Sequence, residues 1–260
     1  MLNQQQQLAD AFPGFMNKIQ GQLGEFDVHV LSASPTGGFY MDPCSNCADA
    51  ADCTYNAQPP LCGAQLDACD TRLGAGVTFP AGTGSSNRRC ELFGGNRYIL
   101  GEDPDFTSSF ECIIQAGMNG AIASTRESMA KAISDELSGP EGCNAGFLRK
   151  DALLVVTLLD DLYDQFSQGT MDDWLQALRH AKHDNEDAYA VLVFSTDVDA
   201  GFGNLCKPFE PTEEPNPLRE FANSVKHGHF VSICESSYVE PFDTFVDEVV
   251  SLCENLQIPQ

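Results

Sequence analysis

Apolar residues recur along this chain with two different periods, one typical of helices and one typical of strands. From Leu8 to Leu23 they return at spacings of three and four, which predicts an amphipathic helix over residues 3–23. Pro13 lies inside this segment, where we expect it to kink the helix. Residues 26–33 alternate apolar and polar side chains. This second pattern predicts a half-covered strand near the edge of a sheet.

The second half of the chain alternates strand-like and helix-like segments. Residues 152–159 form a nearly continuous apolar run, which is typical of a strand covered by helices on both faces. Thr170 and Asp173 have the spacing of a capping box, which predicts a helix starting there. The other expected elements are helices at 119–137, 218–225 and 242–256 and strands at 189–194 and 230–234. This order predicts one α/β domain over residues 1–260, with a doubly wound, mostly parallel sheet and helices on both faces.

Residues 35–111 break this pattern. They are rich in Gly, Pro, Asn, Asp and Cys and show little periodicity apart from a short strand near 97–100. Structureless loops of this length are uncommon in compact domains, so we predict a Cys-rich irregular insertion held together by disulfides. The candidate disulfide cysteines are Cys44, Cys47, Cys53, Cys62, Cys69, Cys90 and Cys112, with Cys206 and Cys234 as a further pair joining the last strands.

The eleven cysteines favour an oxidising compartment. A zinc site among residues 44–69 is the alternative, but the spacing is irregular and no histidine joins it. Because eleven is odd, at least one thiol is free or pairs between chains. The residues after Met1 lack the basic start and apolar core of a signal peptide. We therefore expect an extracytoplasmic protein, periplasmic, on the outer membrane surface or secreted, whose signal sequence is not present in this chain.

The net charge of −24 narrows the classes of partner. Such an acidic protein repels nucleic acid and anionic lipid, which excludes both as partners. The same charge favours solubility and the capture of cations or basic surfaces. The longest apolar run is far shorter than the roughly 20 residues that a membrane span needs, so we expect no membrane insertion.

Three segments together resemble a von Willebrand factor type A domain of a bacterial, extracytoplasmic subgroup. Residues 4–15, Gln-Gln-Gln-Gln-Leu-Ala-Asp-Ala-Phe-Pro-Gly-Phe, resemble its first helix. Residues 147–154, Phe-Leu-Arg-Lys-Asp-Ala-Leu-Leu, resemble the approach to its fourth strand, and residues 230–234, Phe-Val-Ser-Ile-Cys, its last strand. The resemblance implies a non-enzymatic adhesion or protein-binding module of the bacterial envelope or cell surface, whose partner is a protein or surface ligand.

Domains of this family bind a divalent cation through an Asp-x-Ser-x-Ser motif, a threonine and an aspartate after the fourth strand. Here the first motif is absent, and Met118 and Asn119 lie where the threonine is expected. Asp160, with Asp161 beside it, matches the aspartate. The resemblance thus implies a degenerate metal site at Asp160 and a binding surface of Met118, Asn119, Asp160 and Asp161. For Asp160 the alternative is an acid that caps the next turn through its local backbone.

The resemblance also bears on the start of the chain. The family's metal motif directly precedes its first helix, and Met1 lies at that position. We therefore expect a truncated N-terminus that lacks the first strand, the metal motif and any signal peptide. No cofactor is certain for this chain, while the full-length protein is expected to bind Mg²⁺ or Ca²⁺.

Two other hypotheses about the function remain open beside the binding module. Asp160, Asp197 and Asp199 could form the acidic cleft of a hydrolase, since each follows a predicted strand. No Gly-x-Ser-x-Gly motif and no phosphate-binding glycine loop occur, so no catalytic residue is assigned. The third hypothesis is a structural envelope protein without a ligand site.

Histidines form two close pairs in the second half of the chain. His180 and His183 are three apart on a predicted helix and would share a face. His227 and His229 flank Gly228 before a predicted strand. A histidine-metal cluster needs a positioned carboxylate partner, and the sequence does not indicate one, so surface histidines are the favoured interpretation.

Overall fold

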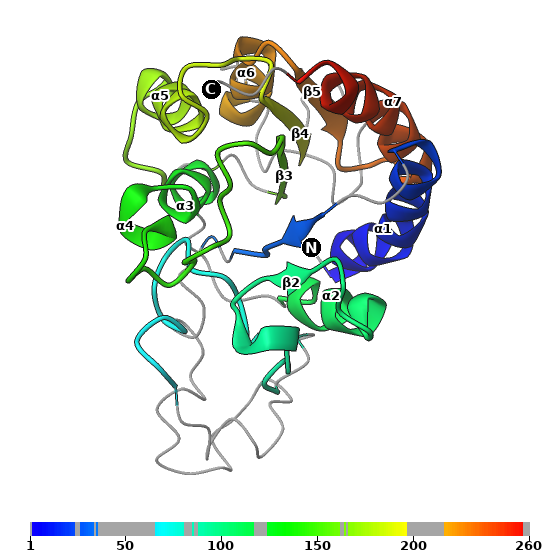
Figure 1. Ribbon diagram of the computed structural model, residues 1–260. Helices are drawn as coiled ribbons and strands as arrows, with labels where there is room; N and C mark the ends of the chain where they lie inside the picture. Colours follow the sequence, from blue (N-terminus) through cyan, green and yellow to red (C-terminus); the bar gives the residue numbers. More distant parts are fainter. Residues whose placement is uncertain are drawn as a thin grey trace. The chain divides into compact units, whose positions relative to one another are not determined.

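The computed structural model describes residues 2–23, 27–33, 35, 66–80, 85, 88–116, 124–161, 164, 166–196 and 216–256 (Figure 1). Two compact units make up the chain. Unit 1 comprises residues 1–9 and 26–148, and unit 2 comprises residues 10–25 and 149–260. The first helix, α1 (Leu2–Leu23), contributes residues to both units and continues through Pro13.

Unit 2 is built on a parallel sheet of three strands among the described residues. The strands are β3 (Leu154–Asp160), β4 (Tyr189–Ser195) and β5 (Gly228–Ser232), in the order β3-β4-β5. Each strand pairs in parallel with its neighbour, and Figure 1 shows the strands of this sheet labelled. The expectation of a mixed α/β fold with a parallel sheet is therefore confirmed, and β5 starts two residues earlier than predicted.

The two apolar strands β3 and β4 are buried to very different extents. All seven residues of β4, the central strand of the three, are buried. In β3 only Leu154, Leu158 and Asp160 are buried, and Thr157 is exposed. The prediction of a strand covered on both faces is thus right for β4 and wrong for β3, one of the two edge strands of the described sheet.

Local signals define the helices of unit 2, which are α5 (Met171–Ala181), α6 (Pro217–Ser224) and α7 (Val239–Asn255). The predicted capping box starts α5, because the Thr170 hydroxyl accepts from the backbone N–H of Asp173 while the Asp173 carboxylate accepts from that of Thr170. Asn216 caps α6, and Pro217 occupies the first turn, where its missing N–H costs no hydrogen bond. Phe242, Phe245 and Val246 begin the buried face of α7.

Unit 1 has short elements. Strand β1 (His29–Val30) pairs antiparallel with β2 (Ile99–Leu100), next to the 3-10 turn Phe93–Gly95. The helices are α2 (Phe106–Ile114), α3 (Thr125–Ala132) and α4 (Asp135–Ser138).

Three expectations for unit 1 need correction. The strand predicted at 26–33 is only two residues long, although the strand expected near 97–100 is present as β2. The single helix expected at 119–137 is divided, because Ser134 leaves the helical conformation and its hydroxyl caps α4. Helix α2 was not predicted, since six of its nine residues lie at the end of the segment assigned as irregular.

Two disulfides join described residues of unit 1. Cys69 bonds Cys143, and Cys90 bonds Cys112. Cys143 was not among the candidate cysteines, so the first bond links the segment 35–111 to a turn beyond it. Because Cys69 is in a disulfide, it does not serve as a zinc ligand. Cys234 of unit 2 is also disulfide-bonded, while Cys44, Cys47, Cys53, Cys62 and Cys206 lie outside the described residues.

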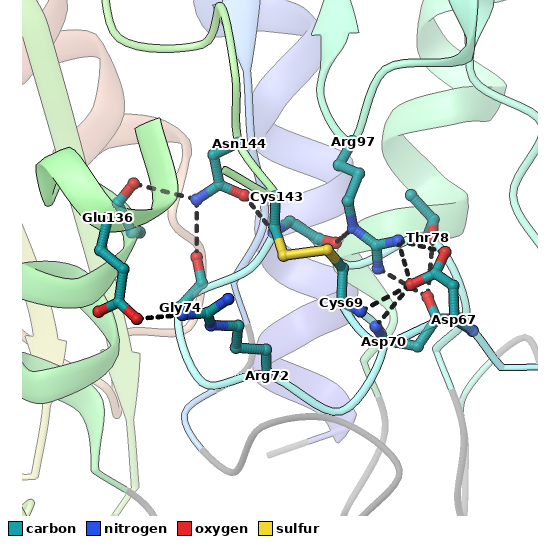
Figure 2. Close-up of a disulfide and its surroundings, with 12 residues drawn as sticks. Asp67, Cys69, Asp70, Arg72, Gly74, Thr78, Arg97, Glu136, Cys143 and Asn144 are labelled. Carbon is teal, nitrogen blue, oxygen red and sulfur yellow. Dashed lines mark hydrogen bonds and ion pairs between the residues drawn. A yellow bond between two sulfur atoms is a disulfide. The ribbon is translucent and has the colours of Figure 1, made fainter. Parts of the chain in front are cut away.

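Beside the first disulfide, the fully buried side chain of Asn144 binds two other segments (Figure 2). Its Oδ1 accepts from the backbone N–H of Gly76 at 2.8 Å. Its Nδ2 donates to the carbonyls of Gly74 and Ala132 at 2.9 and 3.0 Å. The turn at 69–76 thereby lies against the end of α3. Gly76 has to be glycine here, because a Cβ atom would come within 2.0 Å of the Arg97 carbonyl oxygen.

Candidate binding site

Oxygen-bearing side chains occupy the last register of the parallel sheet in unit 2. Asp160 of β3 pairs with Ser195 of β4, and Ser195 pairs with Ser232 of β5. Residues in register on adjacent strands point to the same face and lie roughly 4.8 Å apart. Asp160, only 3 % exposed, is therefore at the carboxyl edge of the sheet, where ligands of open α/β sheets bind.

Asn216 positions the central member of this row. Its Oδ1 accepts from the backbone N–H groups of Leu218 and Arg219 and so caps α6. Its Nδ2 donates to Ser195 Oγ at 3.2 Å and to the carbonyl of Thr196. The hydrogen bonds from this one amide fix both the start of α6 and the end of β4. Because an amide is not a base, Asn216 and Ser195 do not form a nucleophile–base pair.

Thr196 follows β4 directly and is 1 % exposed. Its hydroxyl has no hydrogen-bond partner within the part of the chain that the structure describes. A buried hydroxyl without a partner costs about 1–3 kcal/mol, so such groups are rare and are commonly satisfied by a water or a ligand. Thr196, one residue beyond the row of Asp160 and Ser195, therefore has a buried oxygen whose partner is not among the described residues.

The loop after β3 contributes a second buried carboxylate. Asp164 is buried, and its Oδ1 accepts from the hydroxyl of Ser167 at 2.7 Å. Its backbone φ of 48° lies in the left-handed region, which aspartate tolerates better than most residues. The loop thus places two aspartates, Asp160 and Asp164, within five positions of one another with both side chains buried.

The predicted site residues are only partly covered by the structure. Asp160 is buried at the sheet edge and Asp161 beside it is half-buried. Met118, Asn119, Asp197 and Asp199 lie outside the described residues, so the predicted binding surface and the predicted acidic cleft both stay predictions. The sequence analysis missed Thr196, Asn216 and Asp164. For Asn216 a signal was available, since Asn followed by Pro is typical of a helix start.

The two histidine pairs differ in structure. Helix α5 ends at Ala181, and His183 follows it with a left-handed φ of 51°. The prediction that His180 and His183 share a helix face is therefore wrong. His227 directly precedes β5 and His229 lies within it, as the sequence analysis expected for residues next to a strand.

No family model, no curated protein and no solved structure matches this chain. The class that the fold defines is a mixed α/β protein with a parallel sheet and disulfides. None of the helices in the described ranges is long and apolar enough to cross a membrane.

Proposed function

We propose that this chain is a non-enzymatic, extracytoplasmic binding module of the von Willebrand factor A kind, which engages a protein or surface ligand at the carboxyl edge of its parallel sheet. The observation that carries the proposal is the position of Asp160, buried at the end of β3 and in register with Ser195. An aspartate after this strand is the feature of the family that the sequence retains. The disulfides support an oxidising compartment.

The oxygen atoms at this edge fit a hard cation only in part. Asp160 supplies a carboxylate, and Thr196, the residue after the strand partner of Asp160, has a buried hydroxyl without a hydrogen-bond partner among the described residues. The hydroxyl of Ser195 accepts from Asn216, and the carboxylate of Asp164 accepts from Ser167. Mg²⁺ prefers six oxygen ligands and gives up its waters reluctantly. We therefore propose a degenerate cation site, with weak Mg²⁺ or Ca²⁺ affinity that ligand binding does not depend on.

Calorimetry with Mg²⁺ tests the cation site, with Asp160→Ala beside the wild type. We expect weak or no heat from either protein. Mg²⁺ binding with a dissociation constant in the low micromolar range, absent in Asp160→Ala, would contradict the degenerate site. It would indicate that further residues complete the site.

A panel experiment tests the binding module itself. Wild type, Asp160→Ala and Asp151→Ala are immobilised and exposed to the same purified envelope and matrix proteins. Asp151→Ala is the matched control, because this exposed aspartate lies beyond the opposite end of β3 and its loss changes the net charge equally. Retention of one protein by the wild type and the control, but not by Asp160→Ala, supports the proposal. Equal retention by all three variants places the interface elsewhere.

The same variants distinguish a binding module from a hydrolase. Nitrophenyl acetate, nitrophenyl phosphate and nitrophenyl glycosides report ester, phosphate and glycoside hydrolysis. We expect no turnover by the wild type. Turnover that disappears in Asp160→Ala but persists in Asp151→Ala would favour the acidic-cleft hydrolase.

A further inference from the structure

We draw no further inference here: the strongest candidate, the side-chain cluster that His227 and His229 at β5 form with Glu248 of α7 and Asp187 before β4, carries nothing, because no three His, Cys, Asp or Glu side chains among the described residues could hold a metal ion and the contacts within the cluster leave only the titration of its own members.

Discussion

Cys69 and Cys143 are joined by a disulfide although 74 residues separate them along the chain. The bond ties the turn at 69–76 to the turn that follows α4 (Figure 2). Asn144, the next residue, holds the same turn through Gly74 and Gly76. A covalent bond and a buried amide therefore fix one junction of unit 1 from adjacent positions in the sequence.

Replacing Cys69 and Cys143 together by alanine should destabilise unit 1 strongly. Closing a loop of this length removes conformational entropy from the unfolded chain, which stabilises the folded state by about 2–5 kcal/mol. Thermal unfolding without reductant measures the loss. Cys253→Ala is the control, because its thiol is free and its replacement removes no cross-link. An unchanged melting temperature in the double variant would show that the Asn144 contacts alone maintain the junction.

The stability of unit 1 should depend on the Asn144 amide both as a hydrogen-bond acceptor and as a donor. Asn144→Ala leaves the buried N–H of Gly76 without its acceptor, at a cost of about 1–3 kcal/mol. Asn144→Asp keeps that acceptor but places a charge against the carbonyls of Gly74 and Ala132, so we expect a larger loss than for alanine. Denaturant unfolding ranks the two variants. The reverse order would mean that the donor side of the amide contributes little.

Unit 1 should lose stability in acid through Asp70, whose side chain is 1 % exposed. Burial alone would raise the pKa of Asp70, but hydrogen bonds from Arg89 and Arg97 outweigh it and hold the pKa at about 2, below the ordinary value of 3.8. Because the pKa of the folded state is the lower one, this stabilisation is complete above pH about 4 and disappears as the pH falls through about 2. The shift corresponds to about 2 kcal/mol.

Hydrogen exchange of peptides from residues 66–80 and 88–116, followed as a function of pH, measures this effect of Asp70. Asp70→Asn should exchange faster at neutral pH and show a flatter dependence between pH about 4 and 2. Asp67→Asn is the comparison, since its carboxylate also contacts Arg97 but is mostly exposed, and exposed ion pairs contribute little. Equal behaviour of the two variants would contradict the assignment to Asp70.

Most thiols should be oxidised in the native protein. Titration of the denatured, unreduced chain is expected to find roughly one to three free thiols, as an oxidising compartment implies. Cys253 should be one of them, and burial raises its pKa, so it should react slowly with thiol reagents at neutral pH and faster as the pH rises or the chain unfolds. Mass spectrometry of alkylated peptides locates the label. If most of the thiols were free, the hypothesis of a disulfide-bonded protein would be contradicted.

The hydroxyl of Thr196 should reduce stability when nothing is bound. Thr196→Val replaces a buried, unpartnered hydroxyl by a methyl group of similar shape, so we expect unit 2 to become about 1 kcal/mol more stable. Chemical denaturation followed by Trp174 fluorescence reports on this unit. The same variant should weaken binding at the carboxyl edge, as stabilising changes at functional positions often do. A destabilised variant would show that the hydroxyl is hydrogen-bonded in solution.

Periodicity and short-range signals in the sequence located most elements of unit 2. The apolar runs of β3 and β4, the stripe of α7 and the capping box at Thr170 each depend on residues within a few positions of one another. Such patterns act through local geometry, so they can be read without knowing the fold. Asp160 was singled out because it ends an apolar run at the position where the resembled family has an aspartate.

Only the tertiary structure decided which of these residues meet. The runs of β3 and β4 look alike in sequence, but β4 is the central strand and fully buried, whereas β3 lies at an edge of the described sheet and is buried only in part. Asn216 reaches Ser195, and Glu248 reaches His227, from positions 21 residues away in each case. Cys69 forms a disulfide with Cys143, which is 74 residues away along the chain. Contacts of this kind depend on the order of strands and the packing of helices, and no local pattern of apolar and polar residues specifies them.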